Sequence, residues 1–238
     1  MAESLDIAMK AEYAPDGPVA QRIAAATPAF PFKGIPAFYD ISGILKDPEI
    51  FQLVVDIFVE RYREIGVDSV CGLDARGFIF GPPIALALKK PFFMLRKQGK
   101  LPNMVTGSSY SKEYAGTSTL GVPRGAIAEG DRVLVIDDLV ATGGTLSAAV
   151  ELIKMMKGTV VECACIIELK FLNAKQKFKD LGYEDVPIWA LVSESCAFPS
   201  GLETEPLMSH AECAAGTNVK GVLYVNQRGV YVDDGEAH

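Results

Sequence analysis

Histidine is nearly absent from this sequence. Its 238 residues include only two histidines, His210 and His238, and both lie near the C-terminus. A catalytic triad built on histidine is therefore excluded from the body of the protein. Acid–base chemistry there must use carboxylates, lysine, tyrosine or cysteine.

Long hydrophobic runs are also missing. The longest one, residues 77–88, is interrupted by Pro82 and Pro83, and it falls short of the roughly 18 apolar residues of a membrane span. The acidic N-terminus has no signal-peptide pattern, and the chain ends in Glu-Ala-His rather than a peroxisomal Ser-Lys-Leu. We therefore expect a cytoplasmic protein with no membrane partner.

Cysteines do not form the even, regularly spaced set of a disulfide framework. They number five: Cys71, Cys163, Cys165, Cys196 and Cys213. An odd, irregular set fits a reduced intracellular protein. Cys163 and Cys165 would share one face of a strand with no histidine cluster nearby, so we interpret them as core residues rather than metal ligands.

Basic residues are in the minority. The formal net charge is −7 and the isoelectric point is about 5.0, which argues against a nucleic-acid partner and against an anionic membrane surface. The chain is 49% hydrophobic, with 12 Phe and 8 Tyr. A chain of this length and composition can bury a full core as one large domain, or as one domain with an appendage.

Strand and helix patterns alternate through the middle of the chain. Short apolar strands are predicted at residues 69–73, 91–95, 132–136, 160–167 and 187–192. Helices are predicted from Pro48 to a stop at Gly66, at 78–89, from the glycines after Thr142 to a stop at Gly158, and at 174–181. Such alternation predicts an α/β fold with a mainly parallel sheet flanked by helices. Ligands of such sheets bind beyond the carboxyl ends of the strands.

Three segments fall outside this alternation. The proline-containing residues 1–48 look loop-rich, and residues 98–119 lack periodicity, which indicates a long mobile loop or a hairpin. From residue 196 the composition turns polar, and the apolar stretches 222–225 and 230–232 predict a terminal hairpin. We therefore divide the chain into an N-terminal segment (1–48), a core (49–195) and a C-terminal extension (196–238).

The most informative stretch runs from Val133 to Thr145. Four apolar residues lead directly into two adjacent carboxylates, Asp137 and Asp138, and a loop of small residues, Ala141-Thr142-Gly143-Gly144-Thr145, then opens a helix. Such a loop presents backbone N–H groups and hydroxyls to a phosphate. Carboxylates beside a phosphate site fit a ligand that also carries hydroxyls or a metal, as ribose 5-phosphate with pyrophosphate and magnesium does. The glycine patterns of a Walker loop and of a dinucleotide fingerprint are both absent.

This stretch resembles the phosphoribosyl-pyrophosphate signature of the type I phosphoribosyltransferases. Three further segments resemble the adenine phosphoribosyltransferase branch of that family, and the match covers roughly residues 31–195. They are Gly72-Leu73-Asp74-Ala75-Arg76-Gly77-Phe78-Ile79-Phe80-Gly81-Pro82, Arg96-Lys97-Gln98-Gly99-Lys100-Leu101-Pro102 and Ser109-Tyr110-Ser111-Lys112-Glu113-Tyr114.

The resemblance implies a purine salvage enzyme that converts adenine and phosphoribosyl pyrophosphate (PRPP) into AMP and pyrophosphate. It also implies a requirement for Mg²⁺, a transition state like an oxocarbenium ion, and a homodimer. The fold would be that of the type I phosphoribosyltransferases, in which residues 1–48 form a small hood over the base. No direct protein ligand to the metal is implied, because Mg²⁺ prefers phosphate oxygens and water.

The resemblance also assigns site residues. Asp137 and Asp138 would bind the ribose hydroxyls, and Ala141, Thr142, Gly143, Gly144 and Thr145 would hold the 5′-phosphate. Arg76, Lys97 and Lys100 would bind pyrophosphate, Arg76 and Glu113 would act in catalysis, and Tyr110 and Tyr114 would close the loop. Ala37, Phe38 and Leu139 would bind adenine.

The sequence departs from the family's usual pattern in the base-binding segment, where Tyr39 follows Phe38 in place of an arginine. Two alternatives remain open. One is a related transferase for hypoxanthine, guanine, xanthine or orotate. The other is a non-catalytic sensor of PRPP, although the chain has no helix-turn-helix pattern or basic stripe. We expect the C-terminal extension to pack on the partner subunit or to edge the active site.

Overall fold

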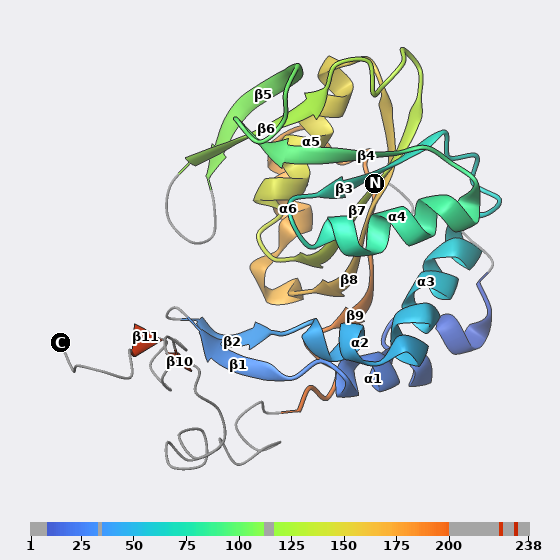
Figure 1. Ribbon diagram of the computed structural model, residues 1–238. Helices are drawn as coiled ribbons and strands as arrows, with labels where there is room; N and C mark the ends of the chain where they lie inside the picture. The colour runs from blue at the N-terminus through green and yellow to red at the C-terminus, as the bar shows by residue number, and fades with distance from the viewer. Residues whose placement is uncertain (1–8, 33–34, 112–116, 200–223, 226–230, 233–238) are drawn as a thin grey trace, which may run out of the picture.

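The computed structural model describes residues 9–32, 35–111, 117–199, 224–225 and 231–232. A seven-stranded sheet forms its centre, in the order β5-β6-β4-β3-β7-β8-β9 (Figure 1). These strands are β5 (Met104–Ser111), β6 (Thr117–Pro123), β4 (Phe92–Lys97), β3 (Ser69–Leu73), β7 (Arg132–Val140), β8 (Thr159–Glu168) and β9 (Ile188–Ser193).

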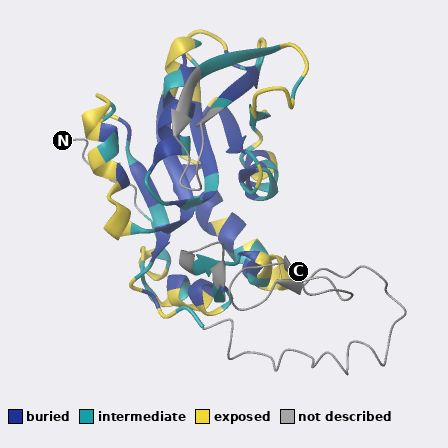
Figure 2. Cartoon of the chain, turned by 90° about the vertical axis from the view of Figure 1, so that its left-hand side faces the viewer, coloured by how far each residue is buried: buried dark blue, intermediate teal, exposed yellow. Residues whose placement is uncertain are grey.

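The five neighbouring strands β4, β3, β7, β8 and β9 run parallel. Strand β6 pairs antiparallel with β4. All five residues of β3 are buried, as expected for a central parallel strand covered on both faces. Figure 2 shows this buried sheet between more exposed layers. The mainly parallel α/β sheet predicted from the sequence is confirmed.

Helices cover both faces of the sheet. On one face α3 (Pro48–Tyr62) and α4 (Gly77–Leu88) contribute to one apolar core, which includes the fully buried Phe58 and Phe80. On the other face α5 (Gly144–Met155) and α6 (Ala174–Asp180) build a second core. The start of α3 is fixed by Asp47, whose carboxylate accepts hydrogen bonds from the backbone N–H groups of the first turn.

The N-terminal segment is more ordered than its composition predicted. It contains η1 (Ala11–Tyr13), α1 (Pro18–Ala25), α2 (Ser42–Lys46) and an antiparallel pair, β1 (Ala29–Phe32) and β2 (Ile35–Tyr39). The prediction of a loop-rich segment was wrong. Pro18 stands in the first turn of α1, where proline is favoured, and Ala20, Ile23 and Ala24 of that helix are fully buried. We refer to β1 and β2 as the hood hairpin.

Two other boundaries differ from the sequence prediction. The helix α3 ends at Tyr62 rather than at Gly66, which has a left-handed backbone (φ +72°) in the turn that follows. Strand β7 continues four residues past Ile136, because β8 still pairs with it as far as Val140. The two carboxylates therefore lie within the strand and not after it.

Of the two structures considered for residues 98–119, the hairpin is the one that forms. Strand β5 pairs with β6 and packs on α5. Strand β5 runs in the same direction as β4, because both pair antiparallel with β6, so its last residue lies at the carboxyl edge of the sheet. Near the C-terminus, β10 (Tyr224–Val225) pairs antiparallel with β11 (Tyr231–Val232), within the segment for which a terminal hairpin was predicted. No helix in the described part of the chain is long and apolar enough to span a membrane.

Candidate active site

The carboxyl ends of β3, β4 and β7 bring together most of the residues singled out in the sequence. The β3–α4 loop packs tightly against β7, and a Cβ added to Gly77 would lie 2.4 Å from the carbonyl oxygen of Ile136. Only glycine permits this close approach. The packing holds Arg76, the residue before Gly77, beside the end of β7.

Arg76 joins two parts of the site. Its Nη1 lies 2.9 Å from Oδ2 of Asp138, and its guanidinium carbon lies 5.3 Å from the ring centroid of Phe38 in the hood hairpin. The first contact is an ion pair and the second has cation–π geometry. The structure therefore brings together one residue predicted for each of three ligand groups: ribose, pyrophosphate and adenine.

The carboxylate pair sits in an environment that disfavours two negative charges. Burial raises the pKa of Asp137, and the neighbouring Asp138 raises it further. Burial also raises the pKa of Asp138, although the charge of Arg76 opposes that shift. Oδ2 of Asp138 is buried and receives no aligned hydrogen bond, so the ion pair with Arg76 is the contact that compensates its burial.

The small-residue loop leads directly into the first turn of α5. Gly143 has a left-handed backbone (φ +80°), and a Cβ there would lie 3.0 Å from the Cβ of Ala174 in α6. Gly143 and Gly144 are buried, while Ala141, Thr142 and Thr145 are half-buried. The first N–H groups of a helix have no partners within the helix, so this loop can present them to an anion.

Lys97 and Lys100 are exposed at the carboxyl end of β4 and share one turn, in which the Lys100 N–H donates to the Lys97 carbonyl at 3.1 Å. Arg96 links this turn to the β3–α4 loop, because its Nε lies 3.3 Å from Oδ2 of Asp74. No role was predicted for Arg96. The adjacent Arg-Lys pair is plain in the sequence, but the partner of the arginine lies 22 positions away in the loop after another strand.

The hood hairpin carries the residues expected to bind adenine. Ala37 and Phe38 lie on β2 and are half-buried. Leu139 is half-buried on β7, directly after Asp138, and packs on the core that lies on the α3 and α4 face. Tyr39, which replaces the usual arginine, packs edge-on against Phe198 with ring centroids 4.5 Å apart. The tyrosine therefore joins the hood to the first residues of the C-terminal extension.

The predicted loop residues are not all described. Glu113 and Tyr114 lie outside the described residues. The backbone of Tyr110 pairs with Ser118 in the β5–β6 hairpin, but its side chain is outside the description. Catalysis by Glu113 and loop closure by the two tyrosines therefore stay predictions.

Comparison with known proteins agrees with this arrangement. The phosphoribosyl transferase domain family matches residues 40–198. Adenine phosphoribosyltransferase 1 of Triticum aestivum is 48% identical over 182 residues, which is 75% of this chain and 96% of that protein. The chain belongs to the adenine phosphoribosyltransferase family. Family membership makes it a pentosyltransferase.

Two more members of the family support the assignment. Adenine phosphoribosyltransferase 3 of Arabidopsis thaliana is 51% identical over 152 residues, 64% of this chain and 82% of that protein. The Trypanosoma brucei adenine phosphoribosyltransferase, solved with AMP, pyrophosphate and ribose-5-phosphate, superimposes with a TM-score of 0.72. That match has 31% identity and covers 87% of this chain and 98% of the other. The type I phosphoribosyltransferase fold predicted from the signature is confirmed.

Proposed function

We propose that this chain makes AMP and pyrophosphate from adenine and PRPP at the carboxyl edge of its sheet. One observation carries the proposal. The guanidinium of Arg76 contacts Asp138 on one side and Phe38 on the other. Asp138 can accept a hydrogen bond from a hydroxyl, Arg76 can bind an anion and Phe38 can stack on an aromatic ring, and PRPP and a purine together offer all three.

The loop from Ala141 to Thr145 binds the 5′-phosphate through backbone N–H groups and the hydroxyls of Thr142 and Thr145. The adjacent helix dipole adds a modest attraction. Asp137 and Asp138 accept hydrogen bonds from the ribose hydroxyls. Their negative charge also favours the positive charge that develops on the sugar as the reaction proceeds.

In the chemical step, N9 of adenine bonds to C1′ of the ribose while the bond from C1′ to the pyrophosphate oxygen breaks. Arg76, Lys97 and Lys100 hold the departing pyrophosphate, and the arginine offers a planar fork that matches phosphate oxygens. Glu113 accepts the proton that the adenine imidazole loses as N9 bonds to C1′. Closure of the loop by Tyr110 and Tyr114 excludes water, which would otherwise hydrolyse the donor.

Magnesium fits this site. The donor set at the end of β7 consists of carboxylate oxygens, the ligands that Mg²⁺ prefers, and Oδ2 of Asp138 is buried without an aligned hydrogen bond. When bound, the ion would neutralise charge on the pyrophosphate, held mainly by PRPP oxygens and water. The protein residues near it are Asp137 and Asp138, which orient the ribose.

We also infer a homodimer. Helix α4 is apolar around its whole circumference, and Leu86 on its outer face is 79% exposed. Exposed apolar surface of this kind favours contact with a second copy of the chain.

The described cysteines, Cys71, Cys163, Cys165 and Cys196, are all free thiols. Free thiols fit a reducing compartment, and we propose the cytoplasm.

The test of the function is an assay of nucleotide formation. The purified protein is incubated with PRPP, Mg²⁺ and, in turn, adenine, hypoxanthine, guanine, xanthine and orotate. We expect AMP from adenine and no product from the other bases. A product from another base alone would identify a related transferase. PRPP binding without any product would identify a sensor.

A further inference from the structure

The hood hairpin is separate from the main sheet. Its two strands pair only with each other within the described residues, and Figure 1 shows them lying beyond the β9 edge of the sheet. The position of Phe38 over the site therefore depends on contacts made by side chains and loops. Those contacts decide how well a base is held.

One set of these contacts comes from residues 193–199, which comprise the last residue of β9 and the segment that follows it. The backbone N–H of Ala29 in β1 donates to the carbonyl of Pro199 at 2.9 Å. Tyr39, next to Phe38 in β2, packs on the ring of Phe198. Both strands of the hood hairpin thus rest on this segment.

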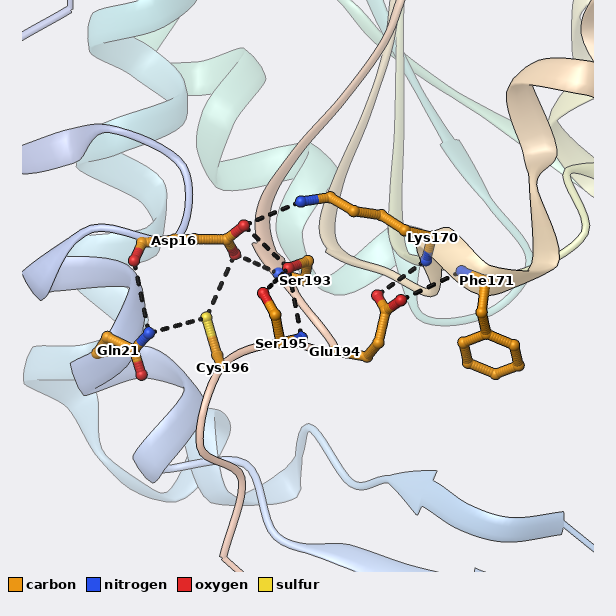
Figure 3. A network of polar contacts seen from close by, with 8 residues as sticks. All are labelled: Asp16, Gln21, Lys170, Phe171, Ser193, Glu194, Ser195 and Cys196. Atoms are coloured by element: carbon orange, nitrogen blue, oxygen red, sulfur yellow. Dashed lines mark hydrogen bonds and ion pairs between the residues drawn. The ribbon is translucent and has the colours of Figure 1, made fainter.

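The segment is in turn fixed by the carboxylate of Asp16. Oδ1 accepts hydrogen bonds from the Ser193 N–H at 2.6 Å and from the Cys196 thiol at 3.3 Å. Oδ2 accepts from the Ser193 hydroxyl and from the Lys170 ammonium, each at 2.9 Å. Figure 3 shows these groups converging on one side chain. Four donors match the four acceptor positions of a carboxylate.

The N-terminal segment adds a second attachment through α1. The Gln21 side-chain oxygen accepts from the Ala197 N–H at 3.3 Å, and its amide nitrogen lies 3.3 Å from the Cys196 sulfur. Asp16 itself adopts a left-handed backbone (φ 58°), with its N–H bonded to the Leu191 carbonyl at 3.0 Å. Aspartate is one of the few residues that tolerate this backbone conformation. Chain positions about 180 residues apart are thereby joined.

We propose that Asp16 is a positioning residue for adenine: its carboxylate fixes residues 193–199, and these hold the hood hairpin and Phe38 over the base site. This inference rests on the proposed role of Phe38 in binding adenine. Asp16 touches no substrate, and its effect is confined to the base. The PRPP site is built on other elements, β3, β4 and β7.

The test compares Asp16→Asn with wild type in steady-state kinetics. The amide puts a donor where the carboxylate presented an acceptor, so at least one of the four hydrogen bonds is lost. We expect the KM for adenine to rise about fivefold to tenfold, the net contribution of one ordinary hydrogen bond, because the loss reaches adenine only through the hood hairpin. We expect the KM for PRPP and kcat at saturating adenine to stay within about twofold of the wild-type values. A loss of folded protein would lower kcat and leave the KM for adenine unchanged, so the split separates positioning from a general structural role.

Three variants complete the experiment. Asp185→Asn removes the exposed ion pair with Lys154 (3.2 Å) close to the amino end of β9, whereas Asp16 bonds to its carboxyl end, and it should change neither KM. Lys170→Gln removes one bond to Asp16 from the solvent side, and it provides the same test should Asp16→Asn fold poorly. Phe38→Ala should raise the KM for adenine on its own.

The outcomes are distinguishable. An unchanged KM for adenine in Asp16→Asn and Lys170→Gln, with Phe38→Ala raising it, would overturn the role of Asp16 alone. An equal loss in the parameters of both substrates, with a lowered melting temperature, would also overturn it. AMP formation with no effect of Phe38→Ala would instead overturn the base site on which the inference rests.

Discussion

Arg76 and Asp138 form an ion pair across the mouth of the site, with Nη1 and Oδ2 2.9 Å apart. The aspartate is almost completely buried, while the arginine side chain is 37% exposed. The charge of Arg76 opposes the rise that burial causes in the pKa of Asp138, and the ion pair fixes the guanidinium that we propose binds pyrophosphate.

Replacement of Arg76 should damage catalysis strongly. Arg76→Ala removes the positive charge that we propose faces the departing pyrophosphate, and we expect kcat/KM for PRPP to fall about 100-fold to 1000-fold. For Arg76→Lys we expect a kcat/KM between that of wild type and that of Arg76→Ala, because an ammonium keeps the charge but lacks the planar fork. The control is Arg22→Ala, since Arg22 forms an exposed ion pair with Glu49 at 3.6 Å. Loss of activity in the control, or its retention in Arg76→Ala, would contradict the assignment.

We expect the buried carboxylate of Asp137 to lower the free energy of unfolding, although the proposed reaction needs it. Burial and the neighbouring Asp138 raise its folded pKa above the unfolded value of about 3.9. The stabilising contribution of a group with a raised pKa is fully present below the unfolded pKa and is lost as the pH rises through the folded pKa. Asp137→Asn should therefore raise the melting temperature at pH 8 by about 2–4 °C for each kcal/mol gained, with a smaller gain at pH 5, while activity falls.

Thermal melts of wild type and Asp137→Asn at both pH values check this prediction. Asp56→Asn, on the exposed face of α3, is the matched control and should show no such difference between the two pH values. A lower melting temperature for Asp137→Asn at pH 8 would mean that the ionised carboxylate stabilises the fold.

The glycine at the start of α5 allows a test with a well-matched control. Gly143 and Gly125 both have left-handed backbones (φ +80° and +83°), but a Cβ on Gly143 would meet Ala174 at 3.0 Å, whereas Gly125 has open space. Each change to alanine should destabilise the fold by about 1–2 kcal/mol through the backbone. Only Gly143→Ala should also raise the KM for PRPP, because it displaces the phosphate loop. Equal KM values for PRPP in the two variants would mean that the loop containing Gly143 does not bind the phosphate.

Glu113→Ala tests the proposed proton-transfer residue. A lost acid–base group lowers turnover by about 100-fold to 10,000-fold, and PRPP affinity measured by calorimetry should stay nearly unchanged. Glu129→Ala is the comparison, since Glu129 is an exposed carboxylate paired with Lys157 at 2.8 Å. Wild-type turnover in Glu113→Ala would remove this residue from the mechanism.

The parts of the fold that the sequence predicted well are those set by local pattern. The apolar strand before Asp137, the glycine loop and the apolar periodicity of α3 each signal their structure within about fifteen residues. The predicted strand ended before Asp137 because two adjacent carboxylates are typical of the end of a strand. The sequence does not show that β8 pairs with these residues as well. Pairing of Val140 with Glu168 extends it.

What could not be predicted depends on residues far apart in the chain. The contact of Arg96 with Asp74 and that of Asp16 with Ser193 leave no local trace, since the polar partners become neighbours only after the sheet has formed. The buried ion pair of Arg61 with Glu162, with Nε and Oε2 2.8 Å apart beneath α3, is another example. Helical periodicity placed Arg61 in α3 but gave no sign that it would be buried.

The most direct test of the account is a crystal structure of the protein grown with AMP, pyrophosphate and Mg²⁺. We expect the 5′-phosphate against residues 141–145, the ribose hydroxyls on Asp137 and Asp138, the pyrophosphate on Arg76, and the adenine ring against Phe38. AMP bound with its phosphate away from the loop of residues 141–145, or with its base away from the hood hairpin, would contradict the proposed site.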